Sequence, residues 1–408
     1  DYDDAICARN ADEGWLLQVA IADVSHYVRP GTELDKAARS RGNSTYFADR
    51  VIPMLPETLS NDLCSLVPEE DRLAVICSIT INSSGEIWEW EFDQAWIRSR
   101  LRLTYDEVDQ YLEKQGERFD RDWGKAVCQS LDIASRIVLA RQDWCIGTGR
   151  IDINFPEIAL TLGDNGTVEA IGYCKSNSAT RLVEGCMLSA NLCAAQTLEK
   201  SLNRAVYRVH QAPSSQDLKH LRQVLQRFGL TLAGGQAPKI SDFNNTLNAA
   251  RERLGRGQWV EGLVLRALKQ ARYDSTVAPH FALGFDCYTH FTSPIRRYPD
   301  LVVHRLLKNI LGYDRSTRID ATAEQLADIS EYCSMTERRA ENAERAVNAC
   351  YKAQFMSDKI GQVFKGSISG VTEFGVFVQL LDIPIDGLVH VSELGGDYYE
   401  FDPHSMEL

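Results

Sequence analysis

Three carboxylates stand within the first four residues of the chain. Asp1, Asp3 and Asp4 lie next to an apolar segment, so they do not belong to a charged tail. Carboxylate oxygens are the ligands that hard cations such as Mg²⁺ prefer, and close carboxylates repel one another unless a cation offsets their charge. In an extended backbone Asp4 points away from the other two, so a joint site requires a bend. The cluster therefore indicates either a magnesium site or a solvated acidic turn.

A second group of chemically capable residues lies far downstream. Residues 290–300 (HFTSPIRRYPD) place Arg296 and Arg297 among aromatic rings and two prolines, directly before a predicted helix. Proline fixes φ and stiffens the loop, which holds the arginines in a defined direction. A guanidinium beside a metal–carboxylate centre can clamp a phosphate and offset the charge of a transition state. The alternative, which suits Arg297 better than Arg296, is an ion pair with Asp300.

The composition limits what these groups can do. The chain has 408 residues, 44 Lys and Arg against 57 Asp and Glu, and a formal net charge of −13. This acidity excludes a protein that binds nucleic acid through a broad positive field, but it leaves room for a local basic channel. Eleven cysteines, an odd number without a C-x-x-C pair, predict a reduced, cytoplasmic protein. No apolar run approaches the roughly 18 residues of a membrane span.

The hydrophobic periodicity predicts both strands and helices. Strands are expected at 16–21, in three runs between 73 and 103, and in a hairpin of 158–162 with 168–173. Helices are expected at 34–41, 105–114, 123–144 and 179–200, in several stretches between 215 and 268, and at 299–311 and 323–351. From residue 359 the pattern changes to short strands divided by glycine. We therefore expect a domain boundary near residue 357.

Four stretches together resemble the catalytic domain of the ribonuclease II / ribonuclease R family, and its ribonuclease R branch most closely. They are residues 1–5 (DYDDA), 21–25 (IADVS), 46–66 (YFADRVIPMLPETLSNDLCSL) and 290–300, in the family's order. The resemblance implies an α+β fold, with a catalytic domain at 1–357 in which helices surround a mixed sheet. Residues 358–408 resemble part of an all-β OB-fold barrel, an RNA-binding domain of the ribosomal S1 type. Because the chain opens without methionine and ends inside this second domain, we expect a piece of a longer protein.

The resemblance also implies a function. Members of this family are processive, hydrolytic 3′-to-5′ exoribonucleases that degrade single-stranded RNA, and in some cases structured RNA, to nucleoside 5′-monophosphates. By this resemblance Asp1, Asp3 and Asp4 hold Mg²⁺, with two ions expected and Mn²⁺ able to substitute. Asp3, Arg296 and Tyr46 are the expected catalytic residues. The expected partner is single-stranded RNA with a free 3′ end, and the expected protein is a monomer that does not bind membranes.

Further residues are expected to bind the substrate. By the resemblance Tyr46 holds the terminal nucleotide, Glu184 contacts a ribose near the 3′ end, and Arg296 contacts the scissile phosphate. Glu344 is expected near the terminal nucleotide. Phe364 and Phe377 are expected to stack on bases, because aromatic residues on OB-fold strands commonly do so. Many family members stack a phenylalanine on the last base, at a position where this chain has Ile153.

Plainer interpretations stay open beside these expectations. Tyr46 could be a core or rim aromatic residue, and Glu184 could be an ordinary surface carboxylate. The arginines at 251, 253 and 256 are expected to form an exposed helix end rather than a phosphate track. Two other functions remain as alternatives: a catalytically impaired RNA-binding member of the same family, and a metal-dependent DNA nuclease or phosphatase.

Overall fold

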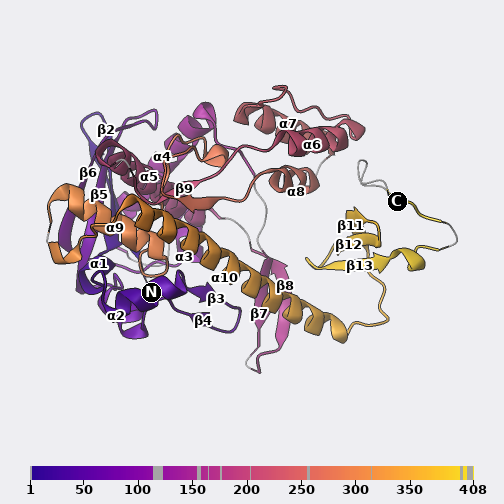
Figure 1. Cartoon of the computed structure of the whole chain (residues 1–408), viewed down its shortest axis with the longest axis horizontal. Helices are drawn as coiled ribbons and strands as arrows, with labels where there is room; N and C mark the ends of the chain where they lie inside the picture. The colour runs from indigo at the N-terminus through magenta and orange to yellow at the C-terminus, as the bar shows by residue number, and fades with distance from the viewer. Residues whose placement is uncertain are drawn as a thin grey trace.

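The computed structural model describes most of the chain. The described residues are 2–113, 123–153, 158–163, 165–174, 177–202, 204–254, 258–313, 315–395, 398–401 and 408. Figure 1 shows a large region of sheet and helices, from which one long helix runs out toward a small sheet near the C-terminus. Within the described part of the chain, no helix is both long and apolar enough to cross a membrane.

A four-stranded antiparallel sheet lies in the larger region, in the order β1-β2-β5-β6. Its strands are β1 (Asp4–Ala11), β2 (Gly14–Ala22), β5 (Asp71–Ile81) and β6 (Ile87–Arg98). The β-branched and aromatic residues of β2, β5 and β6 suit a pleated, packed surface. The turn from β5 to β6 requires Gly85, because φ there is +87° and a Cβ would collide with the carbonyl of Ala140.

Helices α4 (Lys125–Thr148) and α5 (Ser178–Ser201) pack on this sheet, and α9 (Tyr298–Leu311) packs on α5. α5 begins with a capping box, in which the side chains of Asn177 and Thr180 each accept a hydrogen bond from the other residue's backbone N–H. Small residues such as Ala190 and Cys193 are fully buried along α5. They let the helix approach β2 and β5 closely, so the main core is shared between the sheet and the helices.

Helix α10 (Ala323–Ser357) has 35 residues, which corresponds to a length of roughly 50 Å. It is buried at several positions up to Ala340, and no later residue of the helix is buried. Beyond it lies a three-stranded antiparallel sheet of β11 (Gly366–Thr372), β12 (Gly375–Leu380) and β13 (Asp386–His390), followed by a 3-10 turn (Val391–Glu393). The hairpin of β7 (Ile158–Leu162) and β8 (Val168–Tyr173) contacts α10.

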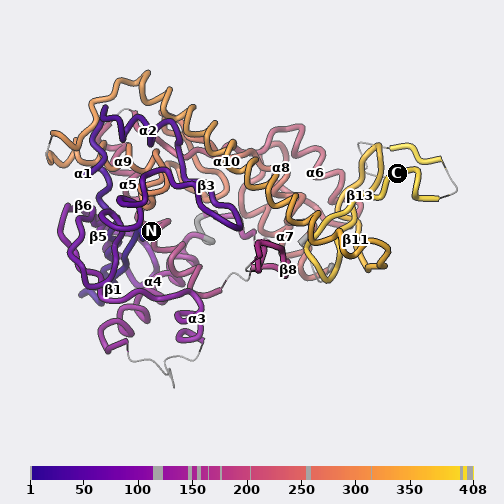
Figure 2. Tube along the Cα trace, turned by 90° about the horizontal axis from the view of Figure 1, so that it is seen from below, coloured from indigo at the N-terminus to yellow at the C-terminus, as the bar shows by residue number. Residues whose placement is uncertain are grey.

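Three further helices form a second, smaller core. They are α6 (Ser215–Arg227), α7 (Ile240–Leu254) and α8 (Gln258–Ala267), and Figures 1 and 2 show them grouped together away from the four-stranded sheet. Their buried side chains include Leu225, Phe243 and Val260, and Ile151 joins the same cluster from the segment that follows α4. This segment is therefore anchored in the second core rather than the main one.

Shorter elements complete the larger region. They are α1 (Val24–Tyr27), α2 (Glu33–Arg41), β3 (Thr45–Tyr46), β4 (Val51–Ile52), a π-helical turn (Thr58–Leu63), α3 (Tyr105–Glu113), β9 (Tyr207–Val209), β10 (Arg272–Asp274) and 3-10 turns at Phe281–Leu283 and Arg315–Thr317. β3 pairs with β4 and β9 pairs with β10, while α10 contacts both β3 and β10.

The structure confirms the predicted α+β class and corrects some of its elements. Two strands, not three, lie between residues 73 and 103, because β6 ends at Arg98. No hydrophobic pattern predicted β1, which begins inside the acidic cluster. Phe364 lies just before β11 rather than within a strand.

Candidate active site

The acidic cluster lies at the start of the first strand of the sheet. β1 pairs Asp4 with Ile21, and the carbonyl oxygen of Asp3 accepts a hydrogen bond from Ala22 N at 2.8 Å. The sheet therefore holds the two acidic residues against the IADVS stretch. Asp3 is 7% exposed and Asp4 is half-buried. Asp1, the third predicted ligand, lies outside the described residues.

The carboxylate of Asp3 contacts the downstream arginine loop. Its Oδ1 accepts a hydrogen bond from Ile295 N at 2.9 Å, although the two residues are 292 positions apart. Its Oδ2 lies 3.7 Å from Arg296 Nε. The two groups that the sequence singled out are thus brought together, and the contact involves Arg296 rather than Arg297.

Burial dominates the electrostatics of this carboxylate pair. Desolvation raises the pKa of Asp3 to about 7, although the hydrogen bond from Ile295 and the charge of Arg296 act in the opposite direction. Desolvation also raises the pKa of Asp4, again opposed by Arg296. The negative charge at the site is therefore only partly offset by protein groups.

Such a pair fits a hard cation. Two oxygen-bearing side chains sit in a desolvated place beside one guanidinium, so a bound cation would remove the penalty that raises both pKa values. Among the described residues, however, no group of three or more His, Cys, Asp or Glu side chains is arranged to hold a metal. Asp3 and Asp4 would thus be two of the ligands rather than the full set.

The arginine loop is held in place by a buried aspartate. Asp300, on α9, is fully buried, and its Oδ1 accepts hydrogen bonds from Ser293 N at 2.8 Å and from Arg297 Nη2 at 2.7 Å. The alternative that the sequence left open for Arg297, an ion pair with Asp300, is confirmed. Arg296 keeps 45% of its side chain exposed and donates to Ser293 Oγ at 3.1 Å. One arginine is structural and the other faces the site.

Two more buried groups fix the start of the same loop. Asn191, on α5, accepts a hydrogen bond from Phe291 N at 2.8 Å, and His304 Nε2 lies 2.8 Å from the carbonyl oxygen of Phe291. His304 is fully buried, and desolvation lowers its pKa to about 4, so it is neutral near pH 7. Because a carbonyl only accepts, the neutral imidazole donates through Nε2.

Tyr46 and Glu344 meet although they are 298 positions apart. Tyr46 N, in β3, donates to Oε1 of Glu344, in α10, at 3.0 Å. Tyr46 is 40% exposed, so it is a rim residue rather than a core aromatic. Partial burial raises the pKa of its hydroxyl, and the charges of Arg296 and Asp3 also act on it. Tyr46 and Arg296 line one cavity of about 140 Å³.

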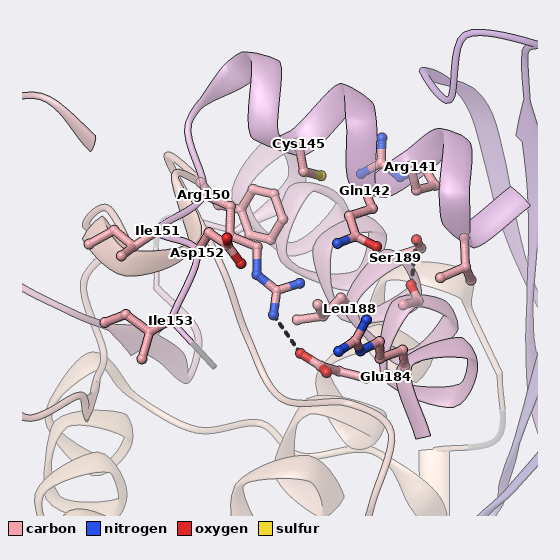
Figure 3. Close-up of a pocket in the computed structure, with 14 residues that line it drawn as sticks. Arg141, Gln142, Cys145, Arg150, Ile151, Asp152, Ile153, Glu184, Leu188 and Ser189 are labelled. Atoms are coloured by element: carbon pink, nitrogen blue, oxygen red, sulfur yellow. Dashed lines mark hydrogen bonds and ion pairs between the residues drawn. The ribbon is translucent and has the colours of Figure 1, made fainter. Parts of the chain in front are cut away.

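Glu184 lines a different cavity, of about 170 Å³, between α4 and α5. Figure 3 shows its carboxylate pointing at Arg150, and the two form an ion pair at 2.6 Å. Ile153, which replaces the expected phenylalanine, lines the same cavity. Glu184 is therefore a paired carboxylate on a cavity wall and not an isolated surface charge. Its contact with a ribose stays a prediction.

The aromatic residues of the C-terminal sheet lie apart from these groups. Phe364 and Phe377 are both half-buried. Phe377, on β12, makes an edge-to-face contact with Phe374, with ring centroids 6.3 Å apart. Phe374 is the more exposed ring, at 43%. Stacking of bases on Phe364 and Phe377 stays a prediction, and Phe374 joins them as a candidate.

Tyr105 is a site candidate that the sequence analysis missed. It is the first residue of α3, is 53% exposed, and lies close enough to Asp4 and Arg296 for their charges to act on its pKa, which partial burial raises. The periodicity identified its helix but assigned the tyrosine no role. The only available signal was an aromatic residue at the start of an otherwise acidic helix turn.

Two models of known protein families match separate parts of this chain. The model of the RNB domain matches residues 1–313, and the model of the S1 RNA binding domain matches residues 357–405. Ribonuclease R of Escherichia coli (strain K12) is 41% identical over 417 residues, which cover 100% of this chain and 51% of that protein. Ribonuclease R of Vibrio cholerae is 40% identical and is covered to 50%. The chain thus spans about half the length of the curated relatives it matches.

Solved structures also resemble this chain. RNase R of Mycoplasma genitalium, in complex with ribose-methylated single-stranded RNA, superposes with a TM-score of 0.94 at 31% identity, covering 100% of this chain and 63% of that one. Yeast Ssd1, a pseudonuclease, superposes with a TM-score of 0.78 at 21% identity, covering 99% of this chain and 49% of that one. The second likeness concerns the fold alone.

Proposed function

The chain belongs to the RNB-domain family, and from this premise we propose that it is the catalytic part of a processive, hydrolytic 3′-to-5′ exoribonuclease that releases nucleoside 5′-monophosphates. One observation carries the proposal most directly. The Asp3 carboxylate accepts a hydrogen bond from Ile295 N and lies beside Arg296. An acidic group and a partly exposed guanidinium are therefore adjacent at this site. That combination suits metal-assisted hydrolysis of a phosphodiester bond, which uses both cation binding and charge stabilisation.

Nucleases of the RNB family are metal-dependent, and we propose Mg²⁺ as the metal, with two ions and Mn²⁺ as a substitute. Asp3 and Asp4 would hold the metal, with Asp1 as a further ligand. When bound, Mg²⁺ would lower the pKa of the attacking water and would offset the negative charge on the leaving 3′ oxygen. The burial that raises the pKa of both described aspartates is consistent with a site that is complete only with a cation.

The protein side chains divide the remaining work. Arg296 stabilises the negative charge that builds up on the scissile phosphate, because its partly exposed guanidinium is held beside Asp3. Tyr46 contacts the terminal nucleotide, and Glu344 holds the backbone of Tyr46. Glu184 contacts a ribose near the 3′ end from the wall of the second cavity. Together these groups bring one bond, and not its neighbour, to the acidic pair.

We further propose single-stranded RNA with a free 3′ end as the substrate. The M. genitalium relative was solved in complex with ribose-methylated single-stranded RNA, and this chain carries an S1-type domain in which Phe364 and Phe377 would stack on bases. A catalytic domain at 1–357 and a partial OB fold at 358–408, a monomeric state and a cytoplasmic location belong to the same proposal. The eleven free cysteines agree with a reducing compartment.

The test uses the intact protein and a 5′-labelled single-stranded RNA, with Mg²⁺ or with EDTA. We expect a very short labelled remnant to accumulate only with the metal. Asp3→Asn should lower turnover by about 10³-fold or more, because it removes a charge from the cation site that is worth several kcal/mol. RNA binding should change little, since the amide oxygen can still accept from Ile295 N.

The outcomes also separate the alternatives. RNA binding without cleavage, by the unsubstituted protein with metal, would favour the catalytically impaired member of the family. Equal degradation of DNA and RNA would favour the DNA nuclease or phosphatase, because a dedicated RNA site contacts the 2′-hydroxyl. Full turnover by Asp3→Asn would refute the role of Asp3 in binding the metal.

A further inference from the structure

Residues 150–153 form the segment between α4 and the β7–β8 hairpin, and the second core anchors them. Ile151 is 6% exposed and belongs to the apolar cluster of α6–α8, and Ile153 packs against that cluster. Ile151 N also donates to the carbonyl oxygen of Ala282 at 2.9 Å. The side chains of Arg150, Asp152 and Ile153 meanwhile line the cavity that contains Glu184.

One side chain of α7 holds the backbone of this segment on both sides of Ile151. Asn244 Nδ2 donates to the carbonyl oxygen of Arg150 at 2.8 Å, and Asn244 Oδ1 accepts from Asp152 N at 2.9 Å. An amide that donates and accepts in this way replaces a strand partner, because it meets the same two backbone groups that a β-ladder would.

Arg251, about two helix turns further along α7, completes the attachment. Its Nη1 donates to Asp152 Oδ2 at 2.8 Å and its Nη2 donates to the carbonyl oxygen of Asp152 at 2.7 Å. The same guanidinium pairs with Glu261, on α8, which is 5% exposed. Arg251 is therefore not part of the exposed helix end that the sequence predicted, because it joins α7 and α8 to the segment; Arg256, from the same prediction, lies outside the described residues.

The attachment leads directly to Glu184. Arg150, whose carbonyl oxygen is held by Asn244, extends its guanidinium to Glu184 Oε1 at 2.6 Å. Both side chains are partly exposed, at 34% for Arg150 and 53% for Glu184, so they face the cavity. The position of the Glu184 carboxylate thus depends on the backbone of Arg150, and that backbone depends on α7.

We propose that Asn244 and Arg251 are positioning residues, which set the place of the Arg150–Glu184 pair and thereby the discrimination between ribose and deoxyribose. This inference rests on the proposed function, in which Glu184 contacts a ribose near the 3′ end. Neither residue touches the substrate itself. They act by holding residues 150–153 against the second core. The guanidinium of Arg150 is then fixed in the position where it pairs with the carboxylate of Glu184.

The experiment compares variants of the intact protein on two single-stranded substrates, one all-RNA and one with 2′-deoxyribose in its last nucleotides. Asn244→Ala removes two hydrogen bonds from the segment, so the ratio of kcat/KM for RNA to that for the deoxy substrate should fall by about tenfold. Arg251→Lys should lower the same ratio by a smaller amount. The ammonium keeps the positive charge beside Asp152 and Glu261, but it cannot reach all of the acceptors that the guanidinium contacts.

Arg253→Ala is the matched control. Arg253 lies on the same helix, but it donates to the carbonyl oxygen of Gly229 at 2.8 Å, which follows α6 and does not belong to residues 150–153. We expect its substrate ratio to stay within about twofold of the unsubstituted protein. If Asn244→Ala fails to fold, as judged by its thermal unfolding, Asn244→Asp takes its place. It keeps the acceptor for Asp152 N and loses the donor for Arg150.

A double variant separates positioning from general destabilisation. If Asn244 acts through Glu184, the effects of Asn244→Ala and Glu184→Ala on the substrate ratio will not add, because the second change removes what the first one positions. Additive effects, or equal losses on both substrates, would overturn the inference while RNA degradation by the unsubstituted protein still stands. No degradation by the unsubstituted protein would instead defeat the proposed function.

Discussion

Two segments of the molecule each present an arginine beside a carboxylate, and they are held by different means. The loop at 290–297 presents Arg296, 45% exposed, next to Asp3, while the segment at 150–153 presents Arg150, 34% exposed, next to Glu184. The loop is tied to groups buried in the main core. The segment is tied to groups of the second core, where Arg251 keeps 31% of its side chain exposed.

The difference concerns how much each segment can move. A hydrogen bond to a fully buried charge is costly to break, since the charge is then left without water or partner. Bonds to partly exposed groups can be replaced by water. The loop that carries Arg296 should therefore be the more rigid of the two, and the cavity wall that carries Arg150 the more adaptable.

The largest expected effect is loss of the loop's buried support. Asp300→Ala removes the partner of Arg297 and the acceptor for Ser293 N, and leaves a largely buried guanidinium uncompensated. We expect the free energy of unfolding to fall by about 3–5 kcal/mol, measured by denaturant titration. The counterpart in the other segment, Asn244→Ala, removes two hydrogen bonds between neutral, partly exposed groups and should cost only about 1–2 kcal/mol. Equal costs would remove the proposed difference in rigidity.

A smaller effect should follow from pH, through His304. Its pKa is about 4 in the folded protein against 6.5 when unfolded, so between these values the unfolded chain binds a proton that the folded one does not. Stability is therefore complete above pH 6.5 and is lost as the pH falls toward 4, by about 3 kcal/mol at most. His304→Gln, which keeps a donor for the carbonyl of Phe291, should show a correspondingly flatter pH dependence of unfolding. Identical slopes would contradict the assignment.

A third effect, slightly smaller in free energy than the effect of pH, should be on catalysis. Arg296→Ala should lower kcat by about 10²-fold and change RNA affinity much less, because in the proposed mechanism Arg296 acts on charge that develops in the transition state. Its side chain is partly exposed, so thermal stability should change little. Arg150→Ala should instead alter the preference for ribose with a smaller change in kcat. A loss of affinity alone in Arg296→Ala would contradict the transition-state role.

The sequence predicted those elements whose periodicity is strong. The bounds of α5 and of the β7–β8 hairpin agree with expectation to within a residue or two, because α5 has a long helical spacing of apolar residues and the hairpin carries an Asn-Gly turn signal. β1 gave no comparable signal, since its residues Asp4–Ala11 mix acidic, basic and small side chains and only Ala8 is buried. A strand held mainly by its neighbour's hydrogen bonds leaves little trace in hydrophobicity.

The site itself divides in the same way. The nearness of Asp3 to Arg296, and of Tyr46 to Glu344, was expected only from family resemblance, because no local pattern joins residues nearly 300 positions apart. The role of Arg251 could not be predicted at all. On a helical wheel it belongs to a basic helix end, and its partners Asp152 and Glu261 come from two other segments.

One consequence of α10 concerns distance along the molecule. The helix is continuous from Ala323 to Ser357, and Glu344, which holds Tyr46, lies within it. The stretch from Glu344 to Ser357 therefore spans roughly 20 Å, because each helical residue advances by 1.5 Å. Tyr46 is thereby kept at a set distance from the end of the helix at Ser357, after which the chain continues to the C-terminal sheet. Inserting a few residues between Glu344 and Ser357 would lengthen this distance along α10 without changing the residues at either end.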